Sequence, residues 1–419
     1  MSEMSRTLEH VTCLGCGCAC DDIDVVVRDG RIAEARRACP LGSEWFGNGV
    51  VPAQVLVNGR SVDSGVALDY AASVLRQATR TMVFLSPDLS CEAQRAAVAI
   101  ADTLRALLDS VTTEAAPSIL AAQRRGRAGA TLGEIRNRAD VVVFWGVDPA
   151  RRYPRFFERY APNPVGLHVD GRGARTVVAV DLDDGDARGP VDADVRIRFS
   201  GAEELDAIGA LRASLAGRAT GGATEGLASR VGELAKRLGG ARYATVVVDG
   251  EPGSAPNTGR SEALLSLVDT LNGVTRAALT TLRGGGNRSG ADAVLTWQTG
   301  YPMSIDFARG YPTYRPDEGA ARWLAAGTAT AALVLGRWRP VTGVALPTDV
   351  VAIGPGASSA FPRAQVAIDT GVAGIHEGGT ALRMDDVPLQ LRAPLPGSLD
   401  TASVIQALAV RVGAMRGGS

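Results

Sequence analysis

The sequence predicts an α/β protein with a small N-terminal cysteine-rich unit followed by two Rossmann-like parallel-sheet domains. Three observations predict this fold. Short, continuous apolar runs alternate with amphipathic runs of helical spacing, which is typical of parallel strands covered by helices on both faces. The 419 residues exceed what one hydrophobic core usually supports. Five of the six cysteines lie between residues 13 and 39, before the alternation begins.

The cysteine-rich unit is predicted to span residues 1–50. Residues 23–36, "IDVVVRDGRIAEAR", indicate a β-hairpin whose turn lies at residues 29–30, an Asp-Gly pair that accepts the positive φ of a tight turn. The hairpin lies between Cys20 and Cys39. We therefore expect it to bring Cys39 back to the other cysteines.

Strands and helices alternate after residue 50. The predicted strands end in Gly, Asp or Pro, as do the strands whose carboxyl ends bind ligands in α/β proteins. Helices are expected at 66–78, 91–107, 203–217 and 260–273, and strands at 81–86, 139–149, 175–184, 241–250, 329–336, 349–354 and 364–371.

We expect one Rossmann-like domain to be inserted into another. Residues 51–111 and 326–419 are expected to form the first Rossmann-like domain. Residues 112–325 are expected to form the second, inserted domain.

Composition excludes several classes of protein. The net charge of −1 argues against nonspecific nucleic-acid binding, which needs a basic surface. The sequence contains no apolar run of the roughly 20 residues that cross a bilayer, and its first residues do not resemble a signal peptide. A cytoplasmic protein is expected, and in that compartment clustered cysteines are more often metal ligands than disulfides.

Four cysteines have the spacing of a metal site. Cys13, Cys16, Cys20 and Cys39 form C-x2-C-x3-C-x18-C. Four converging thiolates suit either a [4Fe-4S] cluster or a tetrahedral zinc ion. A zinc ribbon more typically has two C-x2-C pairs, and the missing second pair favours iron–sulfur. Cys18 does not fit this register and is interpreted as a non-ligand.

The remaining cysteine and histidine residues, and the cluster itself, also allow interpretations without a bound metal. The clustered cysteines could be buried thiols that hold no metal, although such clustering is far from random usage. Cys91 lies on the apolar face of a predicted helix and is expected in the core. His168 is expected on the surface or in a satisfied loop.

Several blocks of sequence resemble the B subunit of formylmethanofuran dehydrogenase, a family of the molybdopterin oxidoreductase superfamily. They follow the family's order from residue 11 to about residue 392 and so cover nearly the whole chain. The blocks are "CLGCGCACDDI", "RRACPLG", "RNRADVVVFWGVDP", "RGGGNRSGADAVLTWQTGYPMSIDF", "YRPDEGAA" and "EGGTALRMDDVPLQLR".

The resemblance implies a redox enzyme architecture. Active members hold a [4Fe-4S] cluster on the N-terminal cysteines and a tungsten or molybdenum bis-pterin between Rossmann-like domains. A cysteine or selenocysteine followed by histidine ligates the metal and handles the proton when carbon dioxide is reduced to formate. The family's four cluster positions correspond to Cys13, Cys16, Cys20 and Cys39.

The redox position departs from this pattern. The matching stretch is "EAAPSILAAQ", in which Pro117 and Ser118 keep the register. Glu114 then stands at the thiolate position and Ala115 at the histidine position. A carboxylate is a harder ligand than a thiolate, and alanine cannot transfer a proton.

Two further features indicate a vestigial redox site. Arg283 is retained in the loop that approaches the cofactor in the family, but "GGGN" follows it and supplies no polar side chain before Asn287. The chain also ends after its Rossmann-like part, so no C-terminal pterin-binding barrel is expected. We expect no tungsten or molybdenum pterin, and a [4Fe-4S] cluster or zinc at the cysteines.

The relatives that lack this redox chemistry are B subunits of the formyltransferase/hydrolase complex of methylotrophic bacteria, and the chain looks like one. The resemblance implies a structural subunit in one-carbon metabolism, with an amidohydrolase-like A subunit, a C subunit and a formyltransferase D subunit as partners. That complex moves a formyl group from tetrahydromethanopterin to a methanofuran-type carrier and hydrolyses it to formate.

Two alternatives compete with this hypothesis. The chain could be an active B subunit of formylmethanofuran dehydrogenase, a tungsten- or molybdenum-dependent oxidoreductase with a changed metal ligand. A free-standing iron–sulfur electron carrier is the weaker alternative, because a lone cluster would need a separate electron acceptor.

Overall fold

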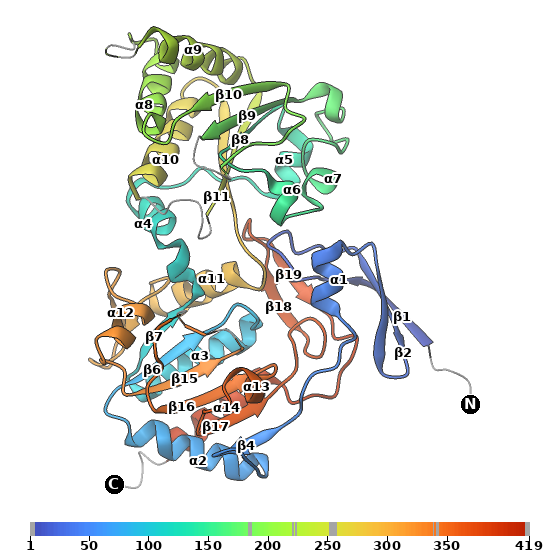
Figure 1. The fold of residues 1–419 in the computed structure, drawn as a ribbon, viewed down its shortest axis with the longest axis vertical. Helices are drawn as coiled ribbons and strands as arrows, with labels where there is room; N and C mark the ends of the chain where they lie inside the picture. The colour runs from blue at the N-terminus through green and yellow to red at the C-terminus, as the bar shows by residue number, and fades with distance from the viewer. Residues whose placement is uncertain are drawn as a thin grey trace. The chain divides into compact units, whose positions relative to one another are not determined.

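The computed structural model divides the chain into two compact units, Met1–Glu114 with Gly285–Ser419 and Ala115–Gly284 (Figure 1). Each unit contains a sheet with parallel strands, which confirms the predicted α/β class. The structure describes residues 5–182, 187–219, 222, 224–250, 258–337, 339–340 and 343–414, without the side chains of 114 and 258. None of the helices in these residues is long and apolar enough to cross a membrane.

A three-stranded antiparallel sheet with the order β1-β2-β3 begins the first unit. The turn between β2 and β3 places Asp29 at φ 46° and Gly30 at φ 70°, in the left-handed region that Asp-Gly turns accept. The elements are β1 (Ser5–Val11), β2 (Ile23–Arg28), β3 (Arg31–Arg36) and α1 (Pro40–Phe46).

The main sheet of the first unit has nine strands in the order β14-β13-β7-β6-β15-β16-β17-β4-β5. The five central strands run parallel, whereas the short pairs at both edges are antiparallel, so this sheet is mixed rather than wholly parallel as predicted. The strands are β4 (Val55–Val57), β5 (Arg60–Ser61), β6 (Thr81–Leu85), β7 (Leu107–Ser110), β13 (Ile305–Asp306), β14 (Thr313–Tyr314), β15 (Ala331–Leu335), β16 (Asp349–Gly354) and β17 (Val366–Asp369).

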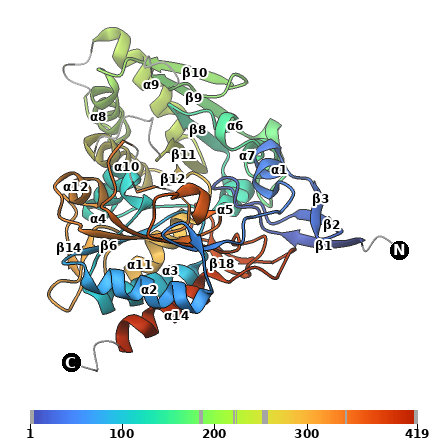
Figure 2. The same cartoon turned by 60° about the horizontal axis from the view of Figure 1, so that its bottom comes forward.

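Successive strand residues point to opposite faces, and each face has its own core. In β6, Val83 and Leu85 pack with α2, α3, α11 and α14, whereas Met82 and Phe84 pack with α12 and α13. Helices α2 and α14 lie side by side (Figure 2). The helices are α2 (Ser64–Gln77), α3 (Cys91–Leu104), α11 (Arg288–Thr299), α12 (Ala320–Ala325), α13 (Ala357–Ala360) and α14 (Thr401–Ala414).

Side-chain caps fix where two of these helices begin. Asp63 accepts a hydrogen bond from the Gly65 amide (2.8 Å) at the start of α2. Ser90 accepts one from the Ala93 amide (3.2 Å) at the start of α3. These bonds satisfy amide groups that have no partner inside the helix.

The second unit holds a five-stranded parallel sheet with the order β10-β9-β8-β11-β12. Its strand β8 is a continuous apolar run, whereas β10 at the sheet edge alternates apolar and charged residues, and α8, α9 and α10 bury one face of the sheet. The strands are β8 (Val141–Trp145), β9 (Thr176–Leu182), β10 (Val195–Phe199), β11 (Tyr243–Asp249) and β12 (Arg276–Leu282), and the covering helices are α8 (Glu204–Leu215), α9 (Glu225–Gly239) and α10 (Thr258–Asn272).

Shorter elements complete the chain. The first unit also contains an antiparallel hairpin, β18-β19, which packs near the cysteine loop. These elements are β18 (Gly379–Leu382), β19 (Pro388–Leu391), η1 (Val111–Ala115), α4 (Ala116–Arg125), α5 (Leu132–Arg138), α6 (Pro149–Arg152), α7 (Phe156–Arg159) and η2 (Arg172–Ala174).

The compact units differ from the predicted domains in three places, of which the shortest is residues 112–114, predicted within the inserted domain but clustered with the first unit. Residues 285–325, predicted within the inserted domain, cluster with the first unit because α11 packs on α3 and β13 pairs with β7. Residues 1–50, predicted as a separate unit, cluster with the first unit as well.

Candidate functional site

The first three predicted ligands lie on one tight loop. The Cys13 amide donates to the Cys20 carbonyl (2.8 Å), and the Ala19 amide donates to the Cys16 carbonyl (3.1 Å). Ala19 adopts φ 39°, in the left-handed region. Cys18 lies on the same loop and is fully buried. The loop thus closes on itself, with its thiols turned away from solvent.

The fourth predicted ligand comes from the start of a helix. Cys39 is the N-cap residue of α1, and Gly42 follows one turn later. A Cβ atom on Gly42 would lie 3.2 Å from Cys13 Sγ and 3.9 Å from Cys39 Sγ. The loop and the helix therefore bring these two sulfurs to one space, which only a residue without a side chain leaves free.

The thiols influence one another's acidity. Burial raises the pKa of the Cys13 thiol, and the charges of Cys16, Cys20 and Cys39 raise it further. A hydrogen bond from Cys18 lowers the pKa of the Cys16 thiol. The four predicted ligands are thus within electrostatic reach of each other, and Cys18 interacts with one of them.

The donor set matches a thiolate-bound group. Four cysteines from one loop and one helix start converge, as cluster and zinc sites require. Within the described ranges, however, no three His, Cys, Asp or Glu side chains are placed to hold one metal ion. The thiols share a space without meeting at single-ion spacing.

Backbone hydrogen bonds anchor the cysteine loop to distant segments of the first unit. The Gly286 amide donates to the Leu14 carbonyl (2.8 Å), and the Met384 amide donates to the Gly17 carbonyl (3.1 Å). Gly285 also packs here, since a Cβ on it would lie 2.6 Å from the Gly15 carbonyl oxygen. The loop is therefore held from both sides.

A cavity of about 170 Å³ adjoins this loop at the carboxyl ends of β6 and β15. The chain leaves β6 toward β7 on one side, and continues from β15 to β16 and β17 on the other, so the strand order reverses between β6 and β15. Parallel α/β sheets bind ligands at such a point. The cavity is lined by Leu14, Trp45, Asp88, Gly286, Arg288 and Arg337, among others.

An aspartate and an arginine meet at this cavity. Asp88 Oδ2 lies 3.7 Å from Arg337 Nε and accepts a long hydrogen bond from the Arg337 amide (3.4 Å). The other carboxylate oxygen, Oδ1, is buried and has no hydrogen-bond partner among the residues that the structure describes. Burial raises the pKa of Asp88, and the charge of Arg337 partly offsets this effect.

The predicted redox position offers neither a thiol nor an imidazole. Ala115 presents a buried methyl group, and the side chain of Glu114 lies outside the described residues. The sequence holds no cysteine after Cys91, which lies in the core as predicted, with its sulfur 3.4 Å from Asn287 Nδ2. A tungsten or molybdenum pterin that needs a thiolate ligand does not fit these residues. Arg283 follows β12 and is buried.

Two buried residues of the first unit were not singled out by the sequence analysis. His376 Nε2 lies 2.8 Å from the Gly49 carbonyl, while its Nδ1 accepts from the Val372 amide, which fixes a neutral ring with the proton on Nε2. Burial raises the pKa of Glu377 to about 7, although Thr401 donates two hydrogen bonds to it. His168, in contrast, is exposed as predicted.

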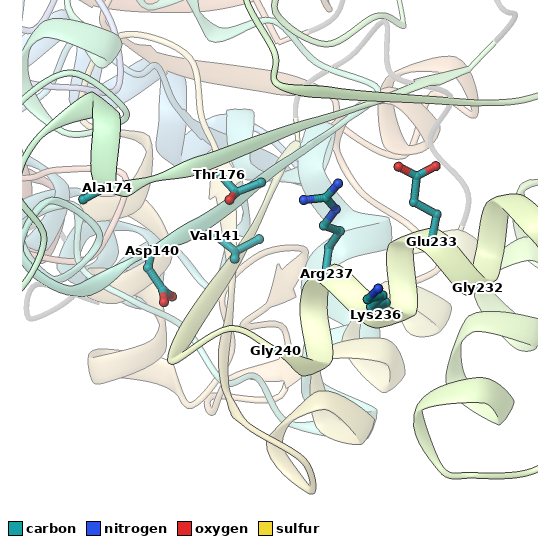
Figure 3. A pocket seen from close by; sticks show the side chains of 9 residues that line it. All are labelled: Asp140, Val141, Ala174, Thr176, Gly232, Glu233, Lys236, Arg237 and Gly240. Carbon is teal, nitrogen blue, oxygen red and sulfur yellow. The ribbon is translucent and has the colours of Figure 1, made fainter.

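A second, larger hollow of about 730 Å³ lies in the second unit (Figure 3). Lys236 and Arg237 on α9 line it together with Val141 and Thr176, the first residues of β8 and β9. It therefore opens at the amino ends of the strands, opposite the edge where parallel sheets bind ligands. Exposed charges at the end of a helix are ordinary surface features.

Comparison with known proteins identifies relatives along the whole chain. No family model matches it. It is 30% identical over 436 residues to the B subunit of tungsten-containing formylmethanofuran dehydrogenase 2 of Methanocaldococcus jannaschii, covering 98% of this chain and 99% of that protein. It is 31% identical over 331 residues to the Fhc B subunit of the formyltransferase/hydrolase complex of Methylorubrum extorquens, covering 77% of this chain and 86% of that protein.

A solved structure supports the same relationship. A chain of the formyltransferase/hydrolase complex FhcABCD from Methylorubrum extorquens, in complex with methylofuran, is similar with a TM-score of 0.72 and 27% identity. The match covers 87% of this chain and all (100%) of that chain. These relatives, matched over most of the chain, show that it belongs to the family of formylmethanofuran dehydrogenase B subunits.

Proposed function

We propose that the chain is a redox-inactive, structural B subunit of a cytoplasmic formyltransferase/hydrolase complex. That complex would convert formyl groups carried on tetrahydromethanopterin and a methanofuran-type carrier to formate. One observation carries the proposal: Ala115, which by its register with Pro117 would occupy the family's proton-handling position, presents only a buried methyl group, and the chain has no cysteine beyond Cys91 to ligate a redox metal.

The similar solved chain supports the proposed partners. It comes from a complex named FhcABCD, in which the chain is one of several subunits. We therefore propose an amidohydrolase-like A subunit, a C subunit and a formyltransferase D subunit as partners. The B subunit would pack against A, whose own site would perform the hydrolysis.

An active dehydrogenase is the second candidate, and one observation favours it. Two relatives matched over 98% of the chain, from Methanocaldococcus jannaschii and Methanococcus maripaludis, are named as B subunits of tungsten-containing formylmethanofuran dehydrogenase 2. Under this alternative another side chain would replace the missing thiolate. The two candidates differ in metal content and in redox activity.

Elemental analysis of the intact purified complex separates them. We expect far less than one equivalent of tungsten or molybdenum per chain, no viologen-coupled oxidation of formate, and intact hydrolysis of the formyl carrier. A tungsten-containing relative, purified in the same way, is the positive control. One equivalent of either metal together with formate oxidation would overturn the proposal.

We further propose that Cys13, Cys16, Cys20 and Cys39 hold a [4Fe-4S] cluster or zinc. The mutual influence of the four thiols on the pKa of Cys13 supports a shared group, and both a cluster and zinc take four thiolates. Such a cluster would supply reversible one-electron chemistry, but the chain supplies no thiolate for a redox metal to accept those electrons, so a structural role is expected.

Iron, zinc and acid-labile sulfide analysis of anaerobically purified protein tests this assignment. We expect a Cys16→Ser variant to lose most of the bound metal. The matched control is Cys91→Ser, which changes a buried cysteine of the core and should keep the full content. Equal metal content in both variants would contradict the assignment.

A further inference from the structure

The cavity beside the cysteine loop has walls that are already rigid. A Cβ on Gly286, which adopts φ 83°, would lie 2.3 Å from the Pro87 carbonyl oxygen. The Asn287 amide donates to this same carbonyl (2.5 Å). Because the Gly286 amide also donates to the Leu14 carbonyl, three backbone segments in contact form the walls, which leaves a preformed cavity that needs little ordering to receive a ligand.

Positive charge gathers around the cavity from two sources. Arg288 and Arg337 both line it, and Arg337 is half exposed. In the part of the chain that the structure describes, the Arg337 guanidinium makes no hydrogen bond; its only ion pair is the one with Asp88 at 3.7 Å. A guanidinium with unused donors is the group that proteins most often use for oxyanions.

The start of α11 adds a third positive source. Asn287 is the N-cap residue, but its side chain makes no capping bond: its Nδ2 donates to the Leu89 carbonyl and its Oδ1 accepts from the Leu382 amide. The first amide groups of this 12-residue helix are therefore not satisfied by the cap. Helix N-termini in this state attract anions.

Asp88 restricts which anion can enter. Its side chain is only 10% exposed, and none of the described residues donates a hydrogen bond to its Oδ1. A fully deprotonated anion would meet the repulsion of this carboxylate. An anion that carries its own proton could donate that proton to Asp88 while its other oxygens face the arginines.

We propose that this cavity binds a small oxyanion that carries a proton, of the size and chemistry of hydrogen phosphate or bicarbonate. The ligand would donate one hydrogen bond to the Asp88 carboxylate and accept from Arg337 and from the start of α11. The cavity volume of about 170 Å³ suits an ion of four or five heavy atoms. The proposal depends on neither the redox state nor the partners of the chain.

Calorimetric titration of the full chain, in the complex in which it is purified, tests the proposal. Sodium phosphate, bicarbonate and sulfate are compared at equal ionic strength near neutral pH. We expect saturable binding of phosphate or bicarbonate at one site per chain, and at least about tenfold weaker binding of sulfate, which can only accept hydrogen bonds. If only one of these two anions binds, that anion is the ligand class for which the cavity is suited.

Variants separate the site from a general surface effect. Arg337→Ala should weaken binding about tenfold or more, whereas the control Arg339→Ala, an exposed neighbour stacked over Phe361, should not. Asp88→Ala should remove the discrimination against sulfate, a result that a merely structural role would not give. If Asp88→Ala does not fold, the wild-type anion series and Arg337→Ala decide.

Three results would overturn the proposal. These are sulfate binding as tight as phosphate or bicarbonate binding in the wild-type chain, no saturable binding of either proton-bearing anion, and equal effects of Arg337→Ala and Arg339→Ala.

Discussion

The two sheets end differently at the points where their strand orders reverse. In the second unit this point lies between β8 and β11, and Arg152, which follows β8, forms a direct hydrogen-bonded ion pair with Asp249 at the end of β11. In the first unit the corresponding pair, Asp88 and Arg337, stands 3.7 Å apart beside a cavity. At the carboxyl ends of the second unit's strands the arginine and the aspartate thus bond each other directly. At the carboxyl ends of the first unit's strands the arginine keeps unused hydrogen-bond donors.

This difference shows that a shared sheet architecture does not by itself decide whether a ligand can bind. Parallel sheets of either unit bring loops together at their carboxyl ends, but whether a ligand can bind depends on how the charged side chains there are paired. An arginine that already bonds its aspartate offers little to a ligand. We therefore expect a ligand to bind at the carboxyl ends of the strands in the first unit and not in the second. The following predictions test this difference.

The largest effect on stability is expected from a substitution in the backbone that walls the cavity of the first unit. Gly286→Ala adds a Cβ 2.3 Å from the Pro87 carbonyl at a φ of 83°, and should lower the free energy of unfolding by about 3 kcal/mol or more. Gly217→Ala is the control, since Gly217 also has positive φ (68°) but meets no atom within 4 Å, and should cost only about 1 kcal/mol. Urea denaturation measures both; equal losses would mean that the walls are not tightly packed.

The buried acid Glu377 should make the stability of the first unit fall as pH rises. Burial, with smaller contributions from the charges of Asp400 and Asp88, raises its pKa from 4.5 to about 7 in the folded protein. Between these values the folded state binds more protons than the unfolded state, so the free energy of unfolding decreases with pH, by about 3 kcal/mol at most, and levels off above pH 7.

The Glu377→Gln variant tests this pH dependence. An amide does not titrate, so the variant should lose this part of the stability difference between pH 5 and pH 8, as measured by urea denaturation at each pH. An unchanged difference would show that Glu377 is not the buried acid responsible.

The two arginines should differ when each is removed. Arg152→Ala removes the direct ion pair that Arg152 makes with Asp249, whose side chain is 9% exposed, and should destabilise the protein by about 2 kcal/mol. Arg337→Ala breaks only the longer pair, and should cost less than about 1 kcal/mol. Thermal unfolding in low-salt buffer without added oxyanion measures both. The comparison fails if Arg337→Ala proves the more harmful.

The smallest effect on stability is expected in the cysteine loop. Gly42→Ala places a Cβ 3.2 Å from Cys13 Sγ and should cost about 1 kcal/mol, because neighbouring groups must shift slightly. We expect a larger effect on metal content, since the added methyl group enters the space between two proposed ligands. Iron and zinc analysis of the variant beside the wild type measures this loss; full metal content would place the bound group elsewhere.

Long apolar runs allowed most of the architecture to be predicted. The predicted strand 81–86 corresponds to β6, and 349–354 to β16, because buried parallel strands leave an unbroken apolar signal. β10 was missed because "VRIRF" alternates apolar and charged residues at the edge of its sheet. The two-residue strands β13 and β14 carry no periodic signal at all.

The cavity could not be predicted from the sequence. Asp88 and Arg337 are 249 positions apart and meet only because β6 and β15 are neighbours in the sheet. The proposed cysteine site, in contrast, is predicted from local spacing alone, and the proposed loss at Ala115 is predicted from its register with Pro117. Local motifs could thus be predicted from the sequence, whereas the cavity, whose residues are brought together by the strand order, could not.

The insertion of the second unit has a consequence for biosynthesis. The second unit is one continuous stretch, Ala115–Gly284, and can fold while the ribosome is still adding the rest of the chain. The first sheet cannot be completed until β15, β16 and β17 emerge, so its central pairing forms late and slowly. The backbone of the cysteine loop is not anchored until the segments at 286 and 384 that bond it are made. During that interval we expect the nascent chain to depend on a reducing environment.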